Sequence, residues 1–311
     1  MRILEFSAES IQLAAEEIQN GNLVIVPTET VYGLAANGLD EVAVRRVFEA
    51  KGRPSENPVI LHVASLEMAK SLVTDWPEPA GILAKRFWPG PLTMVLPRSS
   101  LVPDVISAGL PTAAIRMPAH SVALALMEAA GTPLAIPSAN RFTKLSPTRA
   151  EHISPELAAH VSMILNGGPC VVGIESTVID LSGETPAILR PGGVSKAMLE
   201  DALSMEIRSS GGVGEPKKSP GLYLKHYSPN AKVRLVPVAH AEAHALVFES
   251  RGIHHVLMPK EPSKYAAILY DCLHVLDQLG VEEVEVELPP ESSEWEPILD
   301  RLRKASGAPS G

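Results

Sequence analysis

The sequence predicts an α/β protein with two domains, and three observations support this. The chain has 311 residues, more than the roughly 100–200 residues of a usual single domain. Short apolar runs of strand length alternate with amphipathic segments of helical length along most of it. A glycine-rich polar stretch, SSGGVGEPKK, separates two regions of different pattern. We expect an N-terminal domain over residues 1–208, a linker over 209–230 and a small C-terminal domain over 231–311.

The N-terminal region begins with an amphipathic segment, residues 8–20, that is typical of a helix ending at Asn20-Gly21. A second helix is expected over 40–50, with Asp40 as its N-cap. Further helices are expected over 77–87, 120–130 and 195–203. Strand-length apolar runs occupy 23–26, 59–63, 93–96, 113–116, 134–136, 163–165, 171–172, 177–180 and 187–189. This mixture favours an α/β domain without regular βαβ alternation.

The C-terminal region repeats a simpler pattern. Strands are expected over 233–238, 254–258 and 283–288, and helices over 240–250, 262–279 and 292–304. Three consecutive strand–helix units favour a small, parallel, three-layer α/β domain of Rossmann-like architecture.

Charge and composition exclude several classes of protein. With 27 Lys and Arg against 36 Asp and Glu, the formal net charge is −9, which argues against non-specific nucleic-acid binding. We expect any RNA contact to be weak or indirect. The two cysteines, Cys170 and Cys272, have no paired spacing. No run of about 18 apolar residues and no signal-peptide pattern occurs, so we expect a cytoplasmic protein without membrane segments.

Familiar ligand motifs are missing or incomplete. The stretch GGVGEPKKS at 211–219 looks superficially like a P-loop, but Pro216 replaces the glycine before the lysine and no strand precedes it. No G-x-G-x-x-G opens a helix, and no G-x-S-x-G occurs. The histidines lack metal-ligand spacing, so we expect no protein-bound metal site.

Four segments carry more polar groups than their apolar surroundings explain. They are PTETVYGL at 27–34; KGRPSENP at 51–58 with His62; Thr112 and Arg116 with PSAN at 137–140; and GIESTVI at 173–179 with LRPG at 189–192. Each alone is a weak signal, because capping hydroxyls, solvated charges and a satisfied core histidine are common. Together they place Thr, Ser, Asn, Lys, Arg and His at strand ends with hardly a competing carboxylate. Such a set suits a concave site for a polyanion and a zwitterion.

Arg116 illustrates the alternatives that remain open. An arginine inside an apolar strand is costly to bury unless it is paired. Its partner is either the carboxylate of a ligand or an internal glutamate, and the sequence favours neither.

The segments also carry a resemblance. PTETVYGLAANG, KGRPSENPVILHV, WPGPLTMVL, AAIRMPAH, PSAN and ESTVID…LRPG resemble the YrdC-like domain in order and spacing. SPGLYLKHYSP at 219–229 is similar to the linker of two-domain threonylcarbamoyl-AMP synthases. The resemblance covers nearly the whole chain, more loosely in the C-terminal domain. It implies a twisted mixed sheet with a concave ligand cavity.

The resemblance also implies site residues. For L-threonine they are Thr30, His62, Arg116, Ile136 through its main chain, and Ser176. For ATP they are Lys51, Arg53, Asn57, Thr112, Ser138, Ser146, Arg190, His226 and Tyr227. Lys51 and Arg53 are the expected catalytic pair, because arginine and lysine neutralise phosphate charge. Ile136 is bulkier than the alanine expected there, which matters little if only the main chain is used.

The implied reaction joins L-threonine, bicarbonate and ATP into threonylcarbamoyl-AMP and pyrophosphate, with Mg²⁺ accompanying ATP and no tightly bound cofactor. It is the first step of tRNA threonylcarbamoyladenosine formation, catalysed by a nucleotidyltransferase that would hand its product to a tRNA threonylcarbamoyl transferase complex. The linker would act as a lid over the pocket, or else as an inert tether. Two rivals are a YrdC-like module that binds RNA without chemistry and a hydrogenase-maturation relative that uses carbamoyl phosphate. The acidic balance disfavours the first, and the absence of paired CxxC motifs disfavours the second.

Overall fold

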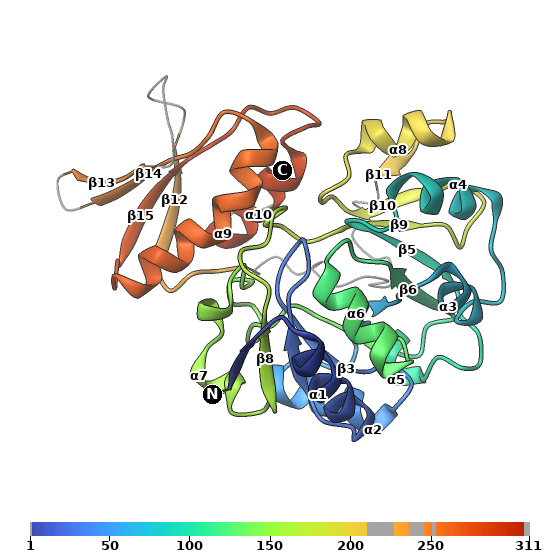
Figure 1. Cartoon of the computed structure of the whole chain (residues 1–311). Helices are drawn as coiled ribbons and strands as arrows, with labels where there is room; N and C mark the ends of the chain where they lie inside the picture. The colour runs from blue at the N-terminus through green and yellow to red at the C-terminus, as the bar shows by residue number, and fades with distance from the viewer. Residues whose placement is uncertain (1, 210–226, 237–245, 251–252, 308–311) are drawn as a thin grey trace.

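The computed structural model describes residues 2–209, 227–236, 246–250 and 253–307. Figure 1 shows two bodies, a large N-terminal one and a smaller C-terminal one beside it. Among the described residues, no helix is long and apolar enough to cross a membrane.

The N-terminal body is built on a mixed sheet of eleven strands. In spatial order the strands are β1 (Ile3–Glu5), β8 (Met163–Asn166), β2 (Val24–Val26), β3 (Gly33–Asn37), β7 (Leu134–Ala135), β4 (Leu61–His62), β6 (Thr112–Arg116), β5 (Leu92–Pro97), β9 (Thr177–Asp180), β10 (Ala187–Arg190) and β11 (Arg208–Ser209). Parallel and antiparallel pairs both occur, such as β5 with β9 and β5 with β6. A mixed α/β fold with a large sheet is therefore confirmed.

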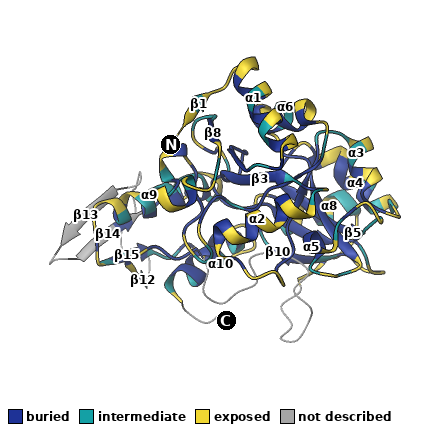
Figure 2. Cartoon of the chain, turned by 90° about the horizontal axis from the view of Figure 1, so that it is seen from below, coloured by how far each residue is buried: buried dark blue, intermediate teal, exposed yellow. Residues whose placement is uncertain are grey.

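Helices cover this sheet on both sides. They are α1 (Ala8–Gln19), α2 (Glu41–Lys51), α3 (Leu66–Ser71), α4 (Glu78–Phe87), α5 (Asp104–Ser107), α6 (Ser121–Ala130), the 3₁₀ turn η1 (Ala150–His152), α7 (Pro155–Ala158) and α8 (Lys196–Leu203). In β2, Val24 and Val26 pack with α1 and α6, whereas Ile25 packs with α2, as the alternation of side chains along a strand requires. Figure 2 shows the outward sides of these helices exposed and the strands buried.

Local signals placed the ends of α1 and α2 to within one residue. Asp40 caps α2 by accepting hydrogen bonds from the backbone N–H groups of Val42 and Ala43. Gly21, just after α1, has φ +75°, the left-handed conformation that glycine favours. The strand expected over 171–172 does not form, because Val171 is 75% exposed and its segment is a loop.

One side of the sheet is left open between β4 and β10. Along β6, Ala113 and Ile115 face the main core. The side chains of Thr112, Ala114 and Arg116 alternate with these two and so point to the opposite face of the sheet. In β10 the register shifts between Ile188 and Arg190, so one extra residue is inserted opposite β9. Such a bulge re-aims side chains. Leu189 then packs with Ala114 on the open side, where Arg190 also lies.

The C-terminal body has a sheet in the order β12 (Lys232–Val236), β15 (Glu283–Glu287), β14 (Ile253–Leu257) and β13 (Leu246–Ser250), with α9 (Pro262–Gln278) and α10 (Glu296–Ser306). The helix expected over 240–250 is wrong for its second half, because β13 pairs antiparallel with β14. The sheet is therefore mixed, not parallel. Val284 and Val286 of β15 are buried in alternation, and Figure 1 shows α9 and α10 together against the sheet. The described residues thus form two layers, not three.

Candidate active site

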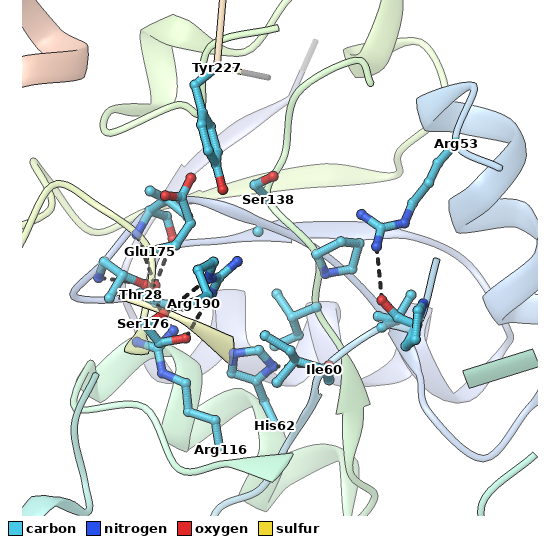
Figure 3. A pocket seen from close by; sticks show the side chains of 17 residues that line it. Thr28, Arg53, Ile60, His62, Arg116, Ser138, Glu175, Ser176, Arg190 and Tyr227 are labelled. Atoms are coloured by element: carbon cyan, nitrogen blue, oxygen red, sulfur yellow. Dashed lines mark hydrogen bonds between the residues drawn. The ribbon is translucent and has the colours of Figure 1, made fainter. Parts of the chain in front are cut away.

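The segments singled out in the sequence meet at one hollow on the open side of the N-terminal sheet (Figure 3). It encloses about 580 Å³ of space when its open mouth is included. Its lining residues are Thr28, Thr30, Val31, Gly33, Arg53, Pro58, Val59, Ile60, His62, Arg116, Ile136, Pro137, Ser138, Glu175, Ser176, Arg190 and Tyr227. Seven separate segments of the chain thus contribute to a single cavity.

Arg116, at the end of β6, is held from three directions. Its Nη2 lies 2.6 Å from Glu29 Oε1, its Nη1 donates to Thr30 Oγ1 at 3.0 Å, and its Nε donates to the Gly90 carbonyl at 3.2 Å. A guanidinium has five N–H donors, so two remain for a ligand. The internal partner left open by the sequence is Glu29, which is 4% exposed.

The turn after β2 positions Thr30. The Thr28 hydroxyl accepts hydrogen bonds from the backbone N–H groups of Thr30 and Val31, both at 3.2 Å. It also donates to the Val31 carbonyl at 2.7 Å and lies 2.8 Å from Thr30 Oγ1. Hydroxyl turns of this kind fix a loop locally, so Thr30 is held in place before any ligand binds.

His62 ends β4 and is buried, with 2% exposure. Burial, and then the nearby positive charge of Arg116, lowers the pKa of His62 well below its usual value. The imidazole is therefore neutral at neutral pH. Its Nδ1 lies 3.3 Å from the Ile60 carbonyl, which can only accept, so the proton resides on Nδ1 and Nε2 is an acceptor.

Arg190 and Ser176 form a hydrogen-bonded pair in the wall of the hollow. Arg190 donates from Nε and Nη2 to the Ser176 carbonyl at 3.2 and 2.9 Å, and from Nη2 to Ser176 Oγ at 3.2 Å. The Ser176 hydroxyl also lies 2.8 Å from Thr93 Oγ1. A hydroxyl and a guanidinium are thereby fixed side by side.

Two carboxylates lie at the site, so the expectation of hardly a competing carboxylate is wrong. Glu29 is paired with Arg116, and Glu175 lines the hollow and pairs with Arg301 at 2.9 Å. Burial alone would raise the pKa of Glu175, but Arg301 and Arg190 lower it to about 2. The charge of Glu29 is therefore balanced by Arg116, a residue of the hollow, whereas that of Glu175 is balanced by Arg301, which does not line it.

The loop after α2 contributes unevenly to the hollow. Arg53 lines it and donates from Nη2 to the Pro58 carbonyl at 2.8 Å. Lys51 is 2% exposed and donates from Nζ to the carbonyls of Ser138 and Asn140. Lys51 therefore anchors the 138–140 loop and lies behind the residues that line the hollow.

The sequence-implied residues divide into two groups. All five threonine positions, Thr30, His62, Arg116, Ile136 and Ser176, line the hollow. Of the ATP positions, Arg53, Ser138, Arg190 and Tyr227 line it, whereas Lys51, Asn57, Thr112 and Ser146 do not. His226 lies outside the described residues.

Asn57 and Ser146 nevertheless lie close to the wall. Asn57 is 1% exposed, and neither of its side-chain polar atoms has a hydrogen-bond partner among the described residues. Buried polar groups are normally paired, so this amide is available to a ligand. Ser146 instead donates to Glu175 Oε1 at 2.6 Å.

The most important residue that sequence reasoning missed is Glu175, together with its partner Arg301. Glu175 stands beside Ser176 in a segment that had been singled out, but its partner is 126 residues away. Pro58, Val59, Ile60 and Pro137 were also missed as lining residues, since apolar positions carry no chemical signal.

The described residues contain no group of three or more His, Cys, Asp or Glu side chains that could hold a metal ion.

A twisted mixed sheet whose open side carries arginines, hydroxyls and a neutral histidine defines an α/β enzyme domain of the YrdC type. A family model described as "Telomere recombination" matches residues 16–192, and one described as "Threonylcarbamoyl-AMP synthase, C-terminal domain" matches residues 194–307. The chain belongs to the two-domain threonylcarbamoyl-AMP synthase family.

Individual relatives cover nearly the whole chain. A threonylcarbamoyl-AMP synthase of Pyrococcus abyssi is 41% identical over 96% of this chain and 94% of its own, and one of Bacillus subtilis is 37% identical over 96% and 93%. The crystal structure of Pyrococcus abyssi Sua5 complexed with L-threonine superposes with a TM-score of 0.87 at 38% identity, covering 99% of this chain and 98% of that one.

Proposed function

We propose that this protein is a threonylcarbamoyl-AMP synthase, a nucleotidyltransferase that converts L-threonine, bicarbonate and ATP into threonylcarbamoyl-AMP and pyrophosphate. One observation carries the proposal. A single hollow is lined by Arg116 and the neutral His62 and also by two further arginines, Arg53 and Arg190. Full-length similarity to enzymes of that name supports the same reaction.

The Arg116 end suits an amino acid with a hydroxyl side chain. The two free donors of Arg116 match a carboxylate, and arginine binds carboxylates in a bidentate manner. Nε2 of His62 is an acceptor for the threonine hydroxyl, and the Ser176 hydroxyl lies on the same wall. A related structure carries L-threonine.

The Arg53 and Arg190 end suits a polyphosphate. Arg53, Ser138 and Arg190 line the hollow. Asn57, whose side-chain amide has no hydrogen-bond partner among the described residues, directly precedes Pro58, which also lines the hollow. Mg²⁺ would enter with ATP, because it prefers phosphate oxygens and water over an all-protein cage. Lys51 acts through the loop it anchors, and any direct role would require its Nζ to turn toward the phosphates.

The chemistry follows from these positions. The threonine amine attacks carbon of CO₂ or bicarbonate, forming an N–C bond and a carbamate, with loss of a proton or of water. A carbamate oxygen then attacks the α-phosphorus of ATP, the P–O bond to the β-phosphate breaks, and pyrophosphate leaves. Such transfer depends on positioning and charge neutralisation, so no side chain is assigned as general base.

A labile mixed anhydride needs protection from water. Tyr227, within the expected linker, is 1% exposed and lines the hollow. Residues 210–226 of the linker lie outside the described residues, so its role as a lid stays a prediction from the sequence. The product would pass to a tRNA threonylcarbamoyl transferase complex in the cytoplasm, as the first step of tRNA threonylcarbamoyladenosine formation.

Product analysis tests the assignment. Incubation with MgATP, L-threonine and ¹³C-bicarbonate should yield a species with the mass of threonylcarbamoyl-AMP carrying one ¹³C, detected by rapid quench and mass spectrometry. D-threonine should yield none. A chain that binds RNA in a salt-sensitive way but forms no such species would support the RNA-binding rival instead.

A further inference from the structure

Arg301 of α10 is a charged side chain from the C-terminal domain buried against the wall of the hollow. Its side chain has 0% exposure. Nε donates to Glu175 Oε2 at 2.9 Å, and Nη1 donates to the Pro191 carbonyl at 2.9 Å. Its guanidinium carbon lies 5.2 Å from the centre of the Tyr227 ring, within cation–π range. One side chain thus contacts three separate segments of the chain.

Each contact is next to a residue of the hollow. Glu175 lines it and precedes Ser176, Pro191 follows Arg190, and Tyr227 lines it directly. Arg190 in turn donates to the carbonyl and hydroxyl of Ser176. Arg301 therefore contacts the segments that carry Glu175, Arg190 and Tyr227. Figure 3 shows these three side chains around the hollow.

The surrounding packing is close. A Cβ at Gly192 would lie 2.4 Å from the Glu175 carbonyl oxygen, so these two segments touch through their backbones. Gly173 has φ +75°, and a Cβ there would lie 2.4 Å from the Ala266 carbonyl oxygen of α9. The C-terminal domain thus packs directly against the 173–176 segment, which carries Glu175, the partner of Arg301.

Charge gives Arg301 a second effect. Glu175 accepts from Ser146 at 2.6 Å and from the Tyr270 hydroxyl at 3.2 Å, but its charged neighbours are Arg301 and Arg190. With Arg301 present, the negative charge of Glu175 is balanced by an arginine that does not line the hollow. The positive charge of Arg190 can then act on a ligand. Without Arg301, the carboxylate would compete with phosphate for Arg190.

We propose that Arg301 is a positioning residue of the active site, through which the C-terminal domain holds Glu175, Arg190 and Tyr227 in place for the triphosphate of ATP. This inference rests on the proposed function for the identity of the ligand. It assigns the C-terminal domain a direct part in forming the nucleotide site.

Replacement of Arg301 by methionine tests the proposal, with Arg303→Met as matched control. Arg303 lies on the same helix, but it is one-third exposed and pairs with Glu291. In Arg301→Met, the Kd for MgATP measured by calorimetry should rise about tenfold or more, because Glu175 loses one of its two arginine partners and then competes with phosphate for Arg190. The Kd for L-threonine should change much less, and Arg303→Met should change neither.

A second substitution separates charge from packing. Glu175→Gln, added to Arg301→Met, removes the uncompensated charge and should restore most of the lost MgATP affinity. A merely structural role predicts no rescue. Glu175 in Arg301→Met should also titrate at higher pH, because Arg190 is then its remaining arginine neighbour. Asp300, which also pairs with Arg301, keeps Lys304 as a partner. The loss of affinity relative to the unmodified chain should therefore shrink as pH falls.

The thermal midpoint of unfolding shows whether each variant is folded. If Arg301→Met does not fold, Arg301→Lys and Tyr270→Phe are measured in its place. Both should weaken MgATP binding more than threonine binding. Unchanged MgATP affinity in the folded variants, or equal losses for both ligands without rescue by Glu175→Gln, would overturn the proposal. Failure of the unmodified chain to release pyrophosphate would instead refute the reaction, and the binding measurements would still test Arg301.

Discussion

Replacement of Arg116 by methionine should weaken L-threonine binding by about 2–4 kcal/mol, or roughly thirty- to a thousandfold in Kd. Arg116 lines the hollow, and its contacts to Glu29, Thr30 and Gly90 leave two donors for the carboxylate. The substitution removes this partner while keeping an unbranched apolar side chain of similar reach. Calorimetry with threonine and, separately, with MgATP measures the effect, and the nucleotide Kd should change far less.

The control must account for Glu29, which loses its ion-pair partner in this variant. A carboxylate left buried and uncompensated is strongly destabilising, so Arg116→Met is also made together with Glu29→Gln. Arg86→Met, which removes a surface pair with Asp201, should leave threonine affinity unchanged. If the folded double variant binds threonine as well as the unmodified chain, Arg116 is not the carboxylate partner.

Replacement of Arg190 by methionine should lower kcat/KM for pyrophosphate release at least about a hundredfold, since arginines that neutralise a transferring phosphoryl group contribute 10³–10⁵ in related chemistry. Arg190 is 4% exposed and is aimed by the bulge in β10 and by its bonds to Ser176. Steady-state kinetics with varied ATP and with varied threonine separate the two ends of the hollow.

Two comparisons sharpen this prediction. Arg190→Lys keeps the charge but loses the planar fork, so it should fall between the unmodified chain and Arg190→Met. Arg208→Met removes an exposed arginine from the neighbouring strand β11 and should have no effect. Full activity in Arg190→Met would remove Arg190 from the nucleotide end.

The longer N-terminal helices, such as α1 and α2, were predicted well because their signals are local, whereas the short helices α3, α5 and α7 were not expected. The Asp40 cap and the glycine after α1 are encoded within a few residues of the helix ends. Residues 246–250, LVFES, are different, because a short apolar run suits either a helix or a strand. Only pairing with β14 makes them a strand, and that contact is not visible in the segment itself.

The site was predicted in part for the same reason. Polar groups at strand ends were visible, and the resemblance to a family ordered them, so Thr30, Arg116 and Arg190 were found. The inward position of Lys51 and the arginine partners of Glu29 and Glu175 depend on tertiary contacts over tens of residues. Sequence patterns could not predict these contacts, and they decide the charge of the site.

Pyrophosphate release under omission of each substrate tests the central claim most directly. We expect release only when MgATP, L-threonine and bicarbonate are all present, with a product-to-enzyme ratio that rises over many turnovers. Release that is independent of threonine, or none in the complete mixture with folded protein, would contradict the account.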